Sequence, residues 1–143
     1  MLNIYEMETV RIENDICVFY ITAESFPAGV LDAHNNLHAL VPFSKKRKYF
    51  GISRPESNGD IVYRAGTEET HANEGSEYNC DTLILKKGNY IALTVADFRD
   101  DPQRIGKAFQ ILLTHPDLDP QGYCVEWYKN DREEVKCMIR LNK

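Results

Sequence analysis

The stretch CVEWYKNDREEVKCMIRL, residues 124–141, has the pattern of a β-hairpin with a carboxylate in the middle of its first strand. Aromatic neighbours that favour strands, Trp127 and Tyr128, follow Glu126, and the Asn-Asp pair at 130–131 is typical of a turn. A charge at the centre of a strand is costly unless it faces water, has a partner or serves a function. The environment of Glu126 is therefore the main question that this sequence raises.

Side-chain alternation along this strand places Glu126 on the same face as Cys124 and Tyr128. The opposite face carries Val125 and Trp127 and is typical of a core, so we expect Trp127 to pack behind Glu126. Cysteine and tyrosine suit a half-buried wall. The residues alone leave two interpretations of Glu126 open, a solvated carboxylate on an exposed strand or a carboxylate in the wall of a pocket.

Upstream of the hairpin, hydrophobic periodicity predicts the same order of elements twice. In the first half, strands are predicted at 2–12 and 16–23, a helix at 30–42, and strands at 48–54 and 60–69. In the second half, two strands are predicted within 82–98 around Lys87-Gly88, a helix at 101–116, and strands at 123–130 and 133–142. A displacement of roughly 74 residues superposes the two sets.

The segment between the halves, residues 70–81, is polar, rich in turn formers and without period, and predicts a long connection without regular structure. We therefore predict an α+β fold with duplicated strand-helix-strand-strand units. The sheet is mainly antiparallel, with two main helices and a central pocket. The whole chain, 1–143, is predicted to be a single domain with pseudo-repeats at about 2–69 and 81–142.

The composition of the chain excludes several classes of function. The chain has 143 residues, 43% of them hydrophobic, and a formal net charge of −5, which argues against general affinity for nucleic acid or an anionic membrane. The start lacks the pattern of a secretory signal, and no apolar run is long enough to span a membrane. The four cysteines form no CxxC motif, so we expect reduced thiols and a cytoplasmic location.

The duplicated order and the closing hairpin resemble the GyrI-like family, the effector-binding domain of bacterial transcription activators. The glycine turn at 87–90, the helix at 101–115 and Glu126-Trp127-Tyr128 with its Asn-Asp pair are similar to the family pattern in the second half. In the first half, DIVYRAGTEE is similar to the family's closing strand through Tyr63 and Gly66. The resemblance covers nearly the whole chain.

The resemblance implies a two-fold pseudosymmetric domain with an aromatic pocket between its halves. Its central acidic residue maps onto Glu126 and would contact lipophilic, cationic small molecules of the multidrug type. Many relatives also carry a DNA-binding region at the N-terminus. Because the first predicted strand begins almost at Met1, we expect none here, and therefore no direct contact with nucleic acid. The ligand-binding candidates that follow are Glu126, Tyr63, Tyr128, Tyr90, Phe50 and Trp127.

Two other functions stay open. A carboxyl with a raised pKa beside a tyrosine hydroxyl can transfer protons, so a small-molecule hydrolase would use Glu126 and Tyr63; otherwise we predict no catalytic residue. A protein-interaction module of the gyrase-inhibitor type would instead act through its surface on a protein partner.

We predict no metal and no cofactor. His34 and His38 have the spacing of zinc ligands on a helix, but Asn35 stands where the metalloprotease pattern needs glutamate, and no third ligand is evident. The basic run at 45–48 is predicted to be a solvated edge.

Overall fold

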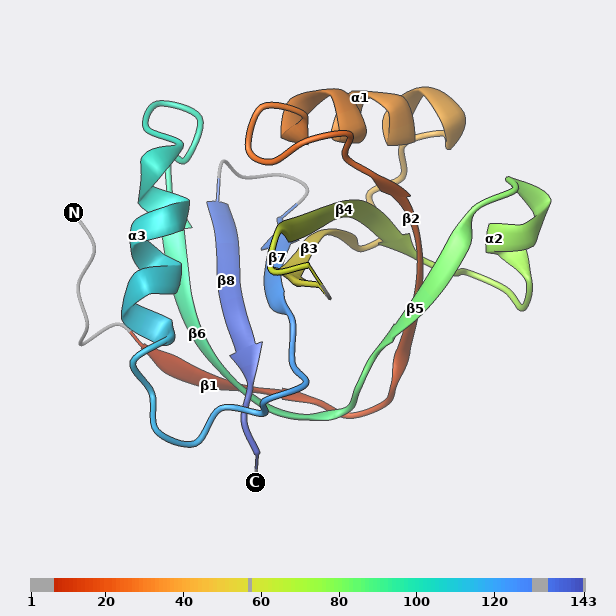
Figure 1. The fold of residues 1–143 in the computed structure, drawn as a ribbon. Helices are drawn as coiled ribbons and strands as arrows, with labels where there is room; N and C mark the ends of the chain where they lie inside the picture. The colour runs from red at the N-terminus through yellow and green to blue at the C-terminus, as the bar shows by residue number, and fades with distance from the viewer. Residues whose placement is uncertain (1–6, 57, 130–133, 143) are drawn as a thin grey trace.

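The computed structural model describes residues 7–56, 58–129 and 134–142. These residues form an α+β fold whose eight strands make one antiparallel, strongly curled sheet, in the order β1-β6-β8-β7-β3-β4-β2-β5 (Figure 1). The elements are β1 (Glu8–Ile12), β2 (Ile16–Thr22), α1 (Val30–Leu40), β3 (Tyr49–Pro55), β4 (Ile61–Glu68), α2 (Glu74–Glu77), β5 (Asp81–Leu85), β6 (Gly88–Ala96), α3 (Gln103–Leu112), β7 (Cys124–Tyr128) and β8 (Glu134–Arg140).

The strand order is symmetric. Exchanging β1–β4 with β5–β8 reverses the order and leaves it otherwise unchanged. Each half contributes one edge strand to the other half, since β1 pairs with β6 and β5 pairs with β2. The halves meet at the centre, where β3 pairs with β7. The predicted α+β class and antiparallel sheet are confirmed. The expected strand at 2–12 lies partly outside the described residues, as does the turn at 130–133.

One face of the sheet is covered by the two main helices. Helix α1 packs against β4 and β2 through Ala33 and Leu37, and α3 packs against β6 and β8 through Ala108 and Leu112. In each helix the two buried residues are four apart, so they lie on the same side. Figure 1 shows α1 above β4, α3 beside β6, and α2 apart from both, beyond β5.

The other face carries no helix among the described residues and encloses a second core. This core contains Ile12 from edge strand β1 and Leu85 from edge strand β5, together with Phe50, Val125 and Met138 from the central strands. Because residues from both edges join one cluster, the sheet curls around this face, which is concave. The central strands are thus covered on both sides, and four successive residues of β3 are buried.

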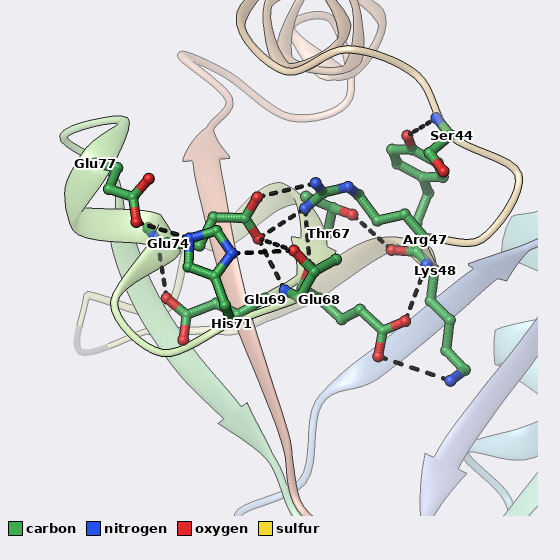
Figure 2. A network of polar contacts seen from close by, with 12 residues as sticks. Ser44, Arg47, Lys48, Thr67, Glu68, Glu69, His71, Glu74 and Glu77 are labelled. Carbon is green, nitrogen blue, oxygen red and sulfur yellow. Dashed lines mark hydrogen bonds and ion pairs between the residues drawn. The ribbon is translucent and has the colours of Figure 1, made fainter.

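The predicted structureless connection at 70–81 is wrong in its middle, where the short helix α2 forms against β2 and β5. The carboxylate of Glu74 lies only 3% exposed and binds both terminal nitrogens of Arg47 at 2.9 Å (Figure 2). It also accepts the backbone N–H of Thr70 at 2.8 Å. A polar segment acquires fixed structure here because its buried charge has a charged partner with matching geometry.

The basic run at 45–48 is likewise not a wholly solvated edge. Arg47 turns inward to Glu74, and Figure 2 shows it between Lys48 and the α2 segment. Neighbouring Lys45 and Lys46 are exposed. The guanidinium holds the pKa of Glu74 well below its ordinary value, at about 2, mainly through these hydrogen bonds. The contact joins the loop after α1 to the connection between the halves.

The four cysteines are free. None of the helices in the described ranges has the length and apolar character needed to cross a bilayer.

Candidate functional site

Glu126 lies at the centre of the helix-covered face. Strand pairing aligns it with Cys137 of β8 on one side and Gly51 of β3 on the other. The same row continues to Leu93 under α3 and to Ala65 under α1. Opposed residues in antiparallel strands point to the same face, so Glu126 projects between the two helix-covered cores.

The carboxylate is buried and receives two hydroxyl groups on one oxygen. Glu126 is 7% exposed, and its Oε1 accepts hydrogen bonds from the hydroxyls of Tyr63 at 2.7 Å and Tyr128 at 2.5 Å. Gly51 makes this convergence possible, because a Cβ at that position would overlap the Tyr63 hydroxyl. The arrangement excludes the interpretation of Glu126 as a solvated strand residue.

The hydrogen bonds extend to helix α1. His34 Nε2 lies 2.7 Å from the Tyr63 hydroxyl oxygen. Since Tyr63 donates its proton to Glu126, the tautomer that completes the chain has its proton on Nε2 and donates to Tyr63. Burial, and to a lesser extent His38, lowers the pKa of His34 to about 4, so the imidazole is neutral near pH 7. The result is a chain from His34 through Tyr63 to Glu126.

Aromatic rings from both halves surround this chain. Phe26, just before α1, stacks on Tyr63 with ring centroids 5.9 Å apart, and Phe98, before α3, meets Tyr128 edge-on at 5.5 Å. His34 also meets Tyr128 edge-on, at 5.2 Å. Phe26 remains 44% exposed. Tyr128 packs against the apolar clusters under both helices, so the site lies where the halves join.

Burial and hydrogen bonds shift the pKa values of the carboxyl, hydroxyl and thiol groups of the site. Burial raises the pKa of Glu126, and the two tyrosine hydroxyls oppose this shift; no cation within residues 7–56, 58–129 and 134–142 contributes to it. Burial and the nearby Glu126 carboxylate raise the pKa of both Tyr63 and Tyr128, so both remain hydrogen-bond donors. Burial also raises the pKa of Cys124 to about 11, which keeps this neighbouring thiol protonated.

Three of the six predicted ligand-binding residues come together here: Glu126, Tyr63 and Tyr128. The other three lie on the concave face. Phe50 and Trp127 are opposed in the β3–β7 pair and alternate with Gly51 and Glu126. Tyr90 is buried on the concave face and donates its hydroxyl to the carbonyl of Lys86. Trp127 packs against the core behind Glu126, as alternation predicts.

Sequence reasoning missed His34, Phe26 and Phe98 as members of the site. A signal existed for His34, which stands four residues after Val30 and one after buried Ala33, next to the inward face of α1. Gly51 also carried a signal, since a glycine inside a strand often marks a close approach. Among the described residues no cluster of three or more metal-ligand side chains occurs, and His34 instead bonds to Tyr63.

No protein-family model matches this chain, and no curated protein matches its sequence. Solved structures do match its fold. An integron cassette protein from the mobile metagenome of Vibrio cholerae superposes with a TM-score of 0.66 at 14% identity, with 95% of each chain covered. A candidate bacterial transcription regulation protein from Staphylococcus aureus MU50 gives a TM-score of 0.56 at 12% identity, covering 94% of this chain and 96% of that one.

The structure of SAV2435 bound to tetraphenylphosphonium is also similar. It superposes with a TM-score of 0.71 at 11% identity and covers 95% of this chain and 93% of that chain. At these identities, what this chain shares with the three proteins is the fold, along nearly its whole length.

Proposed function

We propose that this protein is a small-molecule-binding domain of the GyrI-like type and that it binds lipophilic cations against Glu126. The observation that carries the proposal is a buried carboxylate that has two tyrosine hydroxyls on one oxygen, aromatic rings around it and no cationic partner among the residues that the structure describes. The fold that it shares with SAV2435, solved with a lipophilic cation, supports the same class of ligand.

The energetics favour such a ligand. A buried carboxylate without a countercharge costs several kcal/mol, so the empty site resists ionisation. A cation about 4 Å away would return roughly 4 kcal/mol at an effective dielectric near 20. Contacts with the faces of aromatic rings would add about 0.5–2 kcal/mol each. A neutral ligand of the same shape would gain the apolar contacts but not the charge interaction.

Calorimetric titration with tetraphenylphosphonium tests the proposal. Glu126→Gln keeps the shape and an acceptor oxygen but removes the charge, so affinity should fall at least tenfold, about 1.4 kcal/mol. Glu77→Gln is the matched control, because it removes one exposed carboxylate of α2 and should change affinity less than twofold. Unchanged affinity in Glu126→Gln, or equal losses for the cation and a neutral aromatic ligand, would contradict the role of Glu126.

The hydrogen-bonded chain from His34 to Glu126 supports a second candidate, hydrolysis of strained electrophilic small molecules. Burial raises the pKa of the Glu126 carboxyl, which suits it to proton transfer, and Tyr63 connects it by hydrogen bonds to the neutral imidazole of His34. Turnover of an epoxide panel that disappears in both Glu126→Gln and Tyr63→Phe would favour this function. Tight cation binding without turnover would favour the binding domain.

A further inference from the structure

The concave face of the sheet contains a cavity of about 480 Å³, within the range of small-molecule sites. It lies between the β1–β2 segment, residues 10–17, and the central strands. Phe50 and Trp127 line it, and in the β3–β7 pairing they alternate with Gly51 and Glu126. The sheet backbone therefore separates this cavity from Glu126, and a ligand in one site does not occupy the other.

The floor of the cavity is apolar and partly aromatic. Ile12, Phe50 and Met138 are buried in the concave core, and Val10 and Trp127 are half-buried beside them. Such a surface removes a flat aromatic body from water, at roughly 25 cal/mol per Å² of apolar area.

The rim carries an excess of negative charge. Two cations among the lining residues lie near carboxylates of the same rim: Arg11 is 4.0 Å from Glu13, and Lys48 is 3.7 Å from Glu68. The lining includes two further carboxylates, which add to the negative charge of the rim. Asp15 accepts the backbone N–H of Lys87 at 2.8 Å, and Glu69 accepts that of Gly75 at 2.8 Å.

A cation of the chain itself already lies against the ring of Trp127. The ammonium of Lys129 lies 3.4 Å from the centroid of its ring. Attraction between a cation and the indole face is strongest for tryptophan among the aromatic side chains. The preference for a cationic ligand therefore comes from the carboxylates of the rim, and Trp127 contributes apolar surface to the cavity.

We propose that the concave cavity is a second binding site, for flat aromatic organic cations, separate from the site at Glu126. The apolar floor would cover the aromatic body, and the carboxylates of the rim would face the charge. The inference does not depend on the role proposed for Glu126, because it uses residues of the opposite face.

Titration with proflavine, a flat aromatic cation, tests the proposal, with Glu126→Gln as the reference protein so that the opposite site is weakened. Asp15→Asn combined with Glu69→Gln removes two charges but keeps an acceptor oxygen for each backbone N–H. We expect the dissociation constant to rise at least tenfold. The matched control, Asp60→Asn with Glu77→Gln, removes two exposed charges elsewhere and should change it less than twofold.

A second variant and a local probe keep the test decisive. Val10→Trp would fill the cavity and should abolish saturable binding. In protein without that change, Trp127 is the single tryptophan, so 5-fluorotryptophan labelling gives one fluorine signal, which should shift with the same dissociation constant. No saturable binding, no shift, or an affinity unaffected by the charge variant would overturn the second site. An affinity for tetraphenylphosphonium that is unchanged in Glu126→Gln would instead count only against the proposed function.

Discussion

Two buried glutamates of this protein have opposite environments. Glu74 binds the guanidinium of Arg47 through both oxygens, and its pKa is lowered to about 2. Glu126 has two neutral hydroxyls on one oxygen, and burial raises its pKa. Glu74 has its charge matched by Arg47, whereas Glu126 has no charged partner in the described part of the chain. The comparison separates a contact that stabilises the fold from a site with the capacity to bind a cation.

The largest effect should follow from breaking the matched pair. Arg47→Met would leave the Glu74 carboxylate buried without its guanidinium, and we expect a loss of about 3–5 kcal/mol in the free energy of unfolding. Urea unfolding at pH 7 measures it. Glu77→Gln, which removes an exposed carboxylate of the same helix, is the control and should stay within about 0.5 kcal/mol. A small loss in Arg47→Met would mean that the Arg47–Glu74 pair is not what fixes this region.

Acid should weaken the same contact. The folded pKa of Glu74 is depressed from 4.5 to about 2, so its contribution is present above pH 4.5 and is lost as pH falls towards 2. The loss should reach at most about 3 kcal/mol. Unfolding curves between pH 6 and 3 measure it, with Glu74→Gln as the comparison, because that variant should lack this component of the slope. Identical slopes in the two proteins would contradict the assignment.

A smaller effect should follow from closing the space beside Glu126. Gly51→Ala would place a methyl group against the Tyr63 hydroxyl, and we expect a loss of about 1–3 kcal/mol from overpacking. Gly106→Ala is the matched control, since a Cβ there meets no atom within 4 Å and α3 should gain up to about 1 kcal/mol. Thermal unfolding of both variants measures the difference. Equal changes in thermal stability in Gly51→Ala and Gly106→Ala would mean that the space beside Glu126 is not tightly filled.

Local patterns predicted much of this fold. Alternation along residues 123–128 placed Glu126 and Tyr128 on the face opposite Val125 and Trp127, and the helical periodicity located α1 and α3. These patterns depend on neighbours a few residues apart, and so one sequence contains them.

The remainder depends on strand register and tertiary packing. Phe50 was expected beside Glu126, but the pairing of Gly51 with Glu126 places Phe50 on the other face. A shift of one residue reverses every side chain of a strand, and no local signal fixes the register of β3 against β7. The Arg47–Glu74 contact spans 27 residues and was missed for a related reason, because each partner alone has the pattern of a surface charge.

The smallest expected change in stability concerns Glu126, the second of the two buried glutamates. Because the folded pKa of Glu126 is raised, its contribution to stability is present below pH 4.5 and is lost as pH rises through the folded pKa, the reverse of Glu74. Glu126→Gln should therefore match or exceed the parent in stability at pH 8, by up to about 1 kcal/mol, since Gln keeps an acceptor for both tyrosines. The advantage should shrink or reverse at pH 4.5. Urea unfolding at the two pH values measures the change. A variant that is less stable at pH 8 than at pH 4.5, relative to the parent, would indicate a Glu126 charge stabilised within the chain, as at Glu74, and would leave no reason for a ligand cation there.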